Sequence, residues 1–243
     1  MPETTHAHTA TDESLEDVSL LAFDLYDTLL DRRSVLVPSI EATFERKGYE
    51  GDPEVFLRRY LAMHFRDSLI DSLLGGDHTP FEEITRRALS YRFEEAGIEV
   101  GREDVERVVE GWYRLGPFPE VDDALDRLGE TYGLVGLSNG DREMLEAIRP
   151  SFDADLDGTL SVAEAGAYKP HPAPYELLGE RYDVDPGKVL FVSAHTFDLL
   201  GAKAAGMRGA YLNRHTKPYG KWSRRPDLEV GSAPALAETL LDD

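Results

Sequence analysis

An apolar run that ends in a carboxylate is the feature of this sequence best suited to chemistry. Residues 20–23 have the character of a buried strand, Asp24 follows them directly, and Thr28 lies four positions further on. Ligands bind at the carboxyl ends of the strands in open α/β sheets, so Asp24 would face the place where reactions occur. A carboxylate there can act as a covalent nucleophile, which splits one difficult step into two easier ones. The plainer alternative is a strand-end capping residue.

Polar residues follow two further apolar runs of strand character. Residues 134–137 lead into Ser138-Asn139-Gly140, and residues 189–192 lead into Ser193-Ala194-His195. Because parallel strands end at one edge of a sheet, these side chains can converge on Asp24. Ser138-Asn139-Gly140 is equally compatible with an ordinary turn.

The elements that must position these residues alternate between short apolar runs and helical patterns, which is typical of a parallel sheet flanked by helices. We expect strands at residues 20–25, 134–137, 189–192 and 210–213. Residues 35–116 contain only helical patterns, at 40–47, 54–74, 81–96 and 103–115. The sequence predicts a doubly wound α/β core at residues 18–34 and 117–243, with a helical cap domain, a lid, at 35–116. Residues 1–17 are predicted to form a disordered acidic tail.

Composition limits the classes of protein that fit. The chain has 243 residues, 47 Asp and Glu, 26 Lys and Arg, and no Cys, so disulfides and thiolate nucleophiles are excluded. A net charge of −21 makes nucleic acid an unsuitable partner. The acids are spread over every segment, so we expect a halophilic surface, adapted to molar salt that screens repulsion over ~3 Å. Without a signal peptide or a long apolar run, we expect a cytoplasmic protein with no membrane contact.

Four motifs, in this order, resemble those of the haloacid dehalogenase superfamily, and within it the (S)-2-haloacid dehalogenase branch. They are Phe23-Asp24-Leu25-Tyr26-Asp27-Thr28-Leu29, Leu137-Ser138-Asn139-Gly140, Ala167-Tyr168-Lys169-Pro170 and Phe191-Val192-Ser193-Ala194-His195-Thr196-Phe197-Asp198. The resemblance covers nearly the whole chain from Leu20 onward. It implies a hydrolase that forms an aspartyl ester and dehalogenates small (S)-2-haloalkanoic acids without a cofactor.

The resemblance also implies a role for each residue of the site. Asp24 is the nucleophile, and the Lys169 ammonium holds it ionised and neutralises charge on the intermediate. Asp198 orients or deprotonates the hydrolytic water, although a helix N-terminus would also favour its charge. Four other predicted site residues position the substrate, its charge or Lys169: Thr28, Ser138, Asn139 and Ser193. Four more shape the pocket: Tyr26, Tyr175, His195 and Phe197.

Two positions separate a dehalogenase from a phosphatase of this superfamily. Tyr26 stands where the phosphatases carry a second Asp that protonates the leaving group, and a halide needs no proton. Ser193 stands where they carry an acid that helps to hold Mg²⁺. Both positions favour a metal-independent reaction at carbon. The alternative is a Mg²⁺-dependent phosphatase of small phosphorylated metabolites, in which Asp27 and Asp198 help to hold the metal.

The chain departs from the branch at several positions. Asp27 replaces the usual Gly and either points into the site or is a turn residue, His195 replaces Asn, and Phe197 replaces a Trp of the halide pocket. The branch also has a lid arginine that contacts halide and carboxylate, for which no residue aligns securely. Three candidates lie in the corresponding helix, but the most natural register places Leu61 at that position: Arg58, Arg59 and Arg66.

Residues 153–164 match the calcium-loop pattern, with acids at the first, third, fifth and twelfth positions and Gly at the sixth. We interpret this match as accidental, because the superfamily has a short strand that opens at Leu156-Asp157. Pro170 would also cut short the second helix that such a loop needs. A calcium-dependent scaffold, or a binding protein that has lost turnover, are the non-enzymatic alternatives. Exposed cap residues could support a homodimer.

Overall fold

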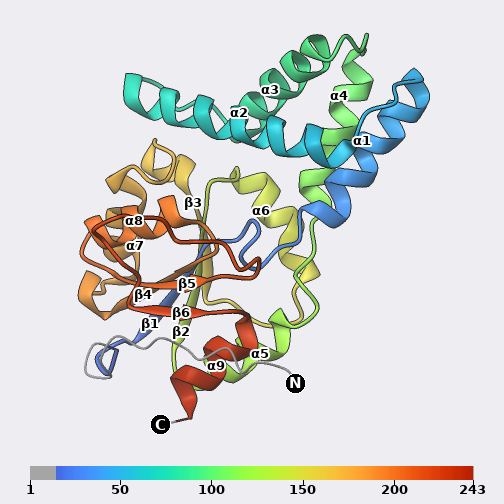
Figure 1. The fold of residues 1–243 in the computed structure, drawn as a ribbon. Coiled ribbons are helices and arrows are strands. Elements are labelled where there is room, and N and C mark those ends of the chain that lie inside the picture. The colour runs from blue at the N-terminus through green and yellow to red at the C-terminus, as the bar shows by residue number, and fades with distance from the viewer. Residues whose placement is uncertain (1–14, 243) are drawn as a thin grey trace.

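Six strands form a single parallel sheet in this computed structural model, which describes residues 15–242 (Figure 1). The strands are β1 (Leu20–Phe23), β2 (Gly133–Ser138), β3 (Gly158–Ser161), β4 (Val189–Ser193), β5 (Arg208–Leu212) and β6 (Leu228–Val230). Their order is β3-β2-β1-β4-β5-β6. The chain therefore winds from β1 to one side and then, through β4, to the other, which confirms the doubly wound prediction. The switch point between β1 and β4 is where such sheets bind ligands.

Burial explains why the central strands could be recognised in the sequence. All residues of β1 and β4 are buried, as expected of parallel strands covered on both faces. The edge strand β6 was not predicted, because three residues are too few to establish either an apolar run or an alternating pattern.

Four α-helices and a 3₁₀ turn follow β1 in the chain and precede α5, and they lie above the sheet in the view of Figure 1. They are α1 (Arg33–Lys47), α2 (Pro53–Leu74), α3 (Phe81–Glu95), α4 (Arg102–Val109) and η2 (Glu110–Arg114). The prediction of a helical cap inserted after the first strand is confirmed. The α1 helix begins at Arg33 rather than at residue 40. Pro38 lies inside it. The α2 helix begins where Asp52 accepts hydrogen bonds from the amides of Glu54 and Val55.

The core helices flank the sheet in pairs, with α5 against α9 and α7 against α8. The bounds are α5 (Val121–Gly129), α6 (Arg142–Ile148), α7 (Pro172–Tyr182), α8 (Thr196–Ala204) and α9 (Ala233–Leu241), with 3₁₀ turns η3 (Arg149–Ser151), η4 (Val162–Ala165) and η5 (Pro186–Lys188). No helix within residues 15–242 is long and apolar enough to cross a membrane. Residues 1–14 of the predicted tail lie outside the described residues.

The calcium-like segment is built into the core. Its residues 158–161 form β3, which pairs with β2. Asp157 accepts a hydrogen bond from the amide of Leu134, and Glu164 forms ion pairs with Arg142 and Arg181. Asp157 therefore stabilises the sheet, and Glu164 stabilises the helices around it.

Candidate active site

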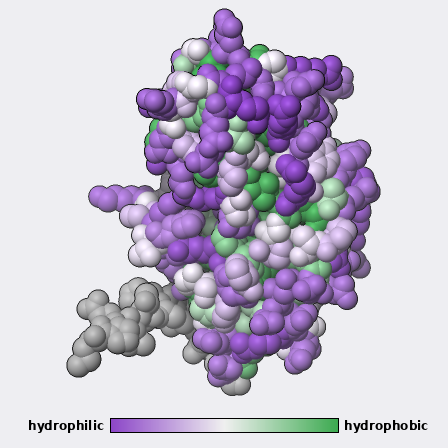
Figure 2. Space-filling view, turned by 90° about the vertical axis from the view of Figure 1, so that its right-hand side faces the viewer, coloured by the Kyte–Doolittle hydropathy of each residue, from purple (hydrophilic) through white to green (hydrophobic). Residues whose placement is uncertain are grey.

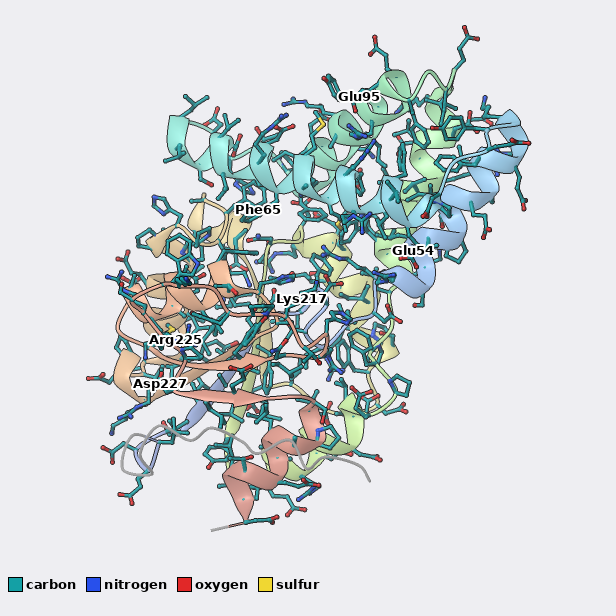
Figure 3. The ribbon with its side chains drawn as sticks, viewed as in Figure 1. Glu54, Phe65, Glu95, Lys217, Arg225 and Asp227 are labelled. Atoms are coloured by element: carbon teal, nitrogen blue, oxygen red, sulfur yellow. The ribbon has the colours of Figure 1, made fainter. Side chains whose placement is uncertain are left out.

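A cavity of about 230 Å³ lies between the carboxyl ends of the strands and the cap. The core contributes Asp24, Tyr26, Arg32, Asn139, His195 and Phe197, and the cap contributes Leu61, Ala62, His64, Phe65, Ser68, Phe81 and Trp112. The side chain of Phe65 lies on the side of α2 that faces the core (Figure 3), with its ring centroid 4.3 Å from that of Phe197. The two parts of the molecule thus close over the end of β1 with mostly apolar walls.

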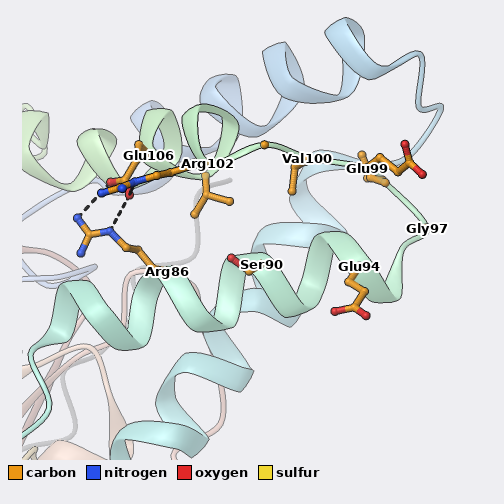
Figure 4. Close-up of a pocket in the computed structure, with 11 residues that line it drawn as sticks. Arg86, Ser90, Glu94, Gly97, Glu99, Val100, Arg102 and Glu106 are labelled. Carbon is orange, nitrogen blue, oxygen red and sulfur yellow. Dashed lines mark hydrogen bonds and ion pairs between the residues drawn. The ribbon is translucent and has the colours of Figure 1, made fainter.

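A larger hollow of about 880 Å³ lies within the cap, between α3 and the segment that leads into α4 (Figure 4). Its two arginines, Arg86 and Arg102, both pair with Glu106 and are thus already engaged. None of the motifs at the strand ends contributes to it. The cavity above β1 is therefore the candidate active site.

Asp24 lies at the end of β1, where its amide donates to the carbonyl of Val192 on β4. The Thr28 hydroxyl donates to Oδ2 of Asp24 at 2.6 Å, and Nζ of Lys169 donates to Oδ1 at 3.0 Å. Thr28 is itself fixed, because its Oγ1 accepts the amide of Ala194 at 2.9 Å. The carboxylate is 5% exposed and lines the cavity, so it is held in place yet open to a substrate.

Lys169 is buried and has a partner for every N–H of its ammonium. Nζ donates to Oδ1 of Asp24, to Oδ2 of Asp198 at 2.7 Å and to the carbonyl of Leu137 at 2.7 Å. Its backbone amide donates to Oδ1 of Asn139 at 2.9 Å. The positive charge is therefore fixed between two carboxylates and is not free to bind a further anion.

The ionisation of Asp24 follows from these contacts. Burial alone would raise the pKa of Asp24, but the nearby Lys169 and His195 and the hydrogen bond from Thr28 together lower it. Burial likewise opposes the charge on Lys169, while Asp198 and Asp24 raise the pKa of that ammonium. Asp24 is consequently ionised at neutral pH, as a nucleophile must be.

Asp198 occupies the first turn of α8 and is completely buried. Its Oδ2 accepts from Lys169 and, at 3.4 Å, from the Ser193 hydroxyl, and its Oδ1 accepts from the Tyr175 hydroxyl. Burial raises the pKa of Asp198, and repulsion by Asp24 adds to this effect. Tyr175 was expected to shape the pocket. It lies instead behind Asp198, fully buried and outside the cavity lining.

The remaining predicted residues lie around this centre. Ser138 is buried at the end of β2, where its Oγ accepts the amide of Gly140 at 3.1 Å. Tyr26 packs its ring against Phe81 and Trp112 at centroid distances of 5.6 and 4.8 Å. His195 stacks on Phe197 at 5.3 Å. The structure thus gathers the four motifs around Asp24.

Asp27 adopts a left-handed backbone conformation with φ of +64° and forms an ion pair with Arg32. Nε2 of His195 lies 3.9 Å from both Oδ2 of Asp24 and Oδ2 of Asp27. Sequence reasoning missed Arg32, since no motif includes it. An Arg five residues after an Asp in a turn was the available signal.

The three candidate lid arginines do not reach the cavity. Arg58, Arg59 and Arg66 are exposed on α2, and the latter two line a different hollow of the cap. Leu61 does line the cavity. His64, Phe81 and Trp112 also line it and were not predicted.

The donors suggested for Mg²⁺ do not fit a hard cation that needs several free oxygen ligands. The Asp27 carboxylate is paired with Arg32, and both oxygens of Asp198 accept hydrogen bonds from Lys169, Ser193 or Tyr175. Within residues 15–242, no group of three or more His, Cys, Asp or Glu side chains is arranged to hold a metal.

Known proteins resemble this chain over nearly its full length. Residues 18–206 match the family described as haloacid dehalogenase-like hydrolase. Haloacetate dehalogenase H-2 of Moraxella sp. (strain B) is 30% identical over 233 residues, which cover 93% of this chain and 99% of that protein. An (S)-2-haloacid dehalogenase of Xanthobacter autotrophicus is 31% identical over 199 residues, which cover 81% of this chain and 76% of that protein.

Solved structures agree with the sequence relatives. The structure of one L-2-haloacid dehalogenase matches with a TM-score of 0.85 at 27% identity and covers 92% of this chain and 98% of its own. Another, from Xanthobacter autotrophicus with chloropropionic acid covalently bound, matches with a TM-score of 0.78 at 26% identity and the same coverage. The chain belongs to the haloacid dehalogenase-like hydrolase family and closely resembles the L-2-haloacid dehalogenases.

Proposed function

We propose that this hydrolase removes the halogen from small (S)-2-haloalkanoic acids through an ester on Asp24. The observation that carries the proposal is the environment of Asp24, a carboxylate with a lowered pKa that Thr28 and Lys169 fix at the floor of a largely apolar cavity. The relative with covalently bound chloropropionic acid supports the same substrate class.

In the first step, a carboxylate oxygen of Asp24 attacks C2 of the substrate, and the halide leaves with the electron pair of the carbon–halogen bond. Attack from the side opposite the halide inverts C2. Lys169 and Thr28 hold the carboxylate in one orientation, which lowers the entropic part of the barrier.

In the second step, water attacks the ester carbonyl carbon of Asp24. The bond between that carbon and the ester oxygen on C2, which came from Asp24, breaks; this oxygen takes up a proton to become the product hydroxyl, and one proton is released overall. Asp198 is the proposed proton acceptor, because Lys169 donates to both Asp198 and Asp24 and thereby holds the two carboxyl groups close together, and burial raises the pKa of Asp198. C2 is not touched again, so an (S)-substrate yields an (R)-2-hydroxy acid.

Two features favour attack at carbon over attack at phosphorus. Tyr26, with a pKa raised by burial and by Asp141 and Asp24, occupies the position of the acid that phosphatases use for the leaving group. The carboxylates proposed for Mg²⁺ are engaged by Arg32, Lys169 and Tyr175. The alternative is a Mg²⁺-dependent phosphatase, and the experiment must distinguish it from the dehalogenase.

The experiment is bromide release from each enantiomer of 2-bromopropionate, in molar KCl with EDTA present. We expect release from the (S)-enantiomer alone, with (R)-lactate as the product and the same rate after Mg²⁺ is added. No bromide from a folded protein, together with Mg²⁺-dependent hydrolysis of a phosphate ester, would replace the proposal by its alternative.

A further inference from the structure

A 2-haloalkanoate brings its own negative charge into a cavity that already holds one. Asp24 is ionised, and the ammonium of Lys169 already has all its N–H bonds directed at Asp24, Asp198 and Leu137. Burying an anion beside another anion is costly unless a cation compensates it. The site therefore needs a second positive group that faces the cavity.

Arg32 is the only Lys or Arg that lines this cavity in the described part of the chain. Its guanidinium carbon lies 6.0 Å from the centroid of the Trp112 ring, and its side chain is 17% exposed. His64 also lines the cavity, but it is neutral at pH 7, because burial, with the charge of Arg32 adding to it, lowers its pKa to about 4. His64 cannot supply the missing charge, and Nε2 of His195 already contacts the carbonyl of Tyr26 at 3.0 Å.

Asp27 fixes the position of Arg32. Nη2 of Arg32 donates to Oδ2 of Asp27, whereas Nε is buried and has no hydrogen-bond partner within residues 15–242. A guanidinium carries five N–H donors in a planar fork, so this contact leaves donors free for a carboxylate. Asp27 has a positive φ, a conformation that is unfavourable for residues other than Gly. An ion pair that orients Arg32 gives this costly position a function.

We propose that Arg32 binds the carboxylate of the substrate and that Asp27 is its positioning residue. The proposal rests on the proposed function and extends it, because it assigns the contact that no arginine of α2 can make. It predicts that the pocket selects acids, because the substrate would place its carboxylate toward Arg32 and thereby C2 over Asp24.

The main test compares Arg32→Met, Arg32→Lys and, as a matched control, Arg87→Met on the outer part of the cap, where Arg87 is exposed. Steady-state bromide release from (S)-2-bromopropionate gives kcat and KM. We expect Arg32→Met to lower kcat/KM on the order of 10- to 100-fold, the loss of a charge-assisted contact. Arg32→Lys should lose less kcat/KM than Arg32→Met, since it keeps the positive charge but not the planar set of guanidinium donors. Arg87→Met should have the kcat/KM of the unaltered protein.

Inhibition by propionate and by propionamide separates carboxylate binding from a structural effect. Propionate should inhibit Arg32→Met more weakly than the unaltered protein by a similar factor, whereas the inhibition constant of the neutral propionamide should not change. A damaged cavity would weaken both inhibitors equally, and that result would overturn the assignment.

The role of Asp27 is tested by a double-mutant cycle. Asp27→Asn should change KM severalfold when Arg32 is present and leave it unchanged in Arg32→Met, because Asp27 acts through Arg32. Equal effects in both backgrounds would refute the positioning role. If the unaltered protein releases bromide and Arg32→Met retains its kcat/KM, this inference fails alone. If the unaltered protein releases none, the proposed function fails and this inference with it.

Discussion

Lys169 stands between two carboxyl groups that behave differently at the same site. Its charge helps to lower the pKa of Asp24, which lines the cavity, whereas burial dominates at Asp198 and raises the pKa of that group. Pairs of acids whose pKa values are driven apart are typical of sites in which one group acts as a base or acid and the other stays ionised. Asp24 is therefore the group that stays ionised as the nucleophile, and Asp198 is the proposed base.

The acid limb of the activity profile should report on Asp198 rather than on Asp24. The Tyr175 hydroxyl donates to Asp198 and stabilises its ionised form, which lowers the pKa of Asp198. Tyr175→Phe removes this bond, so the pKa of Asp198 rises further and the acid limb of kcat should move to higher pH. The measurement is kcat for bromide release against pH in both proteins. An unchanged acid limb in Tyr175→Phe would contradict the role of Asp198.

The sequence could predict the residues around Lys169 better than the pocket wall. Asp24, Ser138 and Ser193 each stand just after or at the end of an apolar run, so the sheet alone brings them together. Arg32 could not be found this way, because it belongs to a loop whose path depends on the positive φ of Asp27. The position of Tyr175 behind Asp198 likewise depends on the packing of α7 against α8.

At the scale of elements, α2 is the helix that makes the cap part of the site. It carries Leu61, His64 and Phe65 into the cavity wall, while Ser68 on the same helix donates to the carbonyl of His64 at 2.9 Å. The extent of α2 could be predicted from the sequence, and the register suggested by the resemblance already placed Leu61 on the side that lines the cavity. Its arginines point elsewhere because the helix register, not the presence of a useful side chain, decides which residues face the core.

The buried His64 on α2 should make stability sensitive to acid. Burial lowers its pKa from the usual 6.5 to about 4, so between these values the unfolded chain binds a proton that the folded protein does not. Stability should therefore fall as the pH drops below 6.5, by about 2 kcal/mol between pH 7 and pH 5 from this group. Urea unfolding at both pH values should show a smaller loss in His64→Gln by about that amount. An identical pH dependence in the two proteins would disprove this contribution.

At the scale of the whole molecule, charge is the dominant property. The face shown in Figure 2 is mostly hydrophilic, with a smaller hydrophobic area near its middle. With a net charge of −21, self-repulsion opposes the compact state at low ionic strength. We expect the thermal unfolding temperature to rise with KCl into the molar range as the charges are screened, and a temperature independent of KCl would argue against salt adaptation.

An ester between Asp24 and the substrate is the central intermediate of the proposed mechanism, and a single turnover in H₂¹⁸O shows whether it forms. With enzyme in excess over (S)-2-bromopropionate, water attacks the ester carbonyl carbon, so ¹⁸O should appear in the carboxylate of Asp24. The lactate should carry an unlabelled hydroxyl oxygen that came from Asp24. Mass spectrometry of the peptide that contains Asp24 and of the lactate measures both. Label in the lactate and none in Asp24 would mean that water attacks C2 directly, and the covalent mechanism would be wrong.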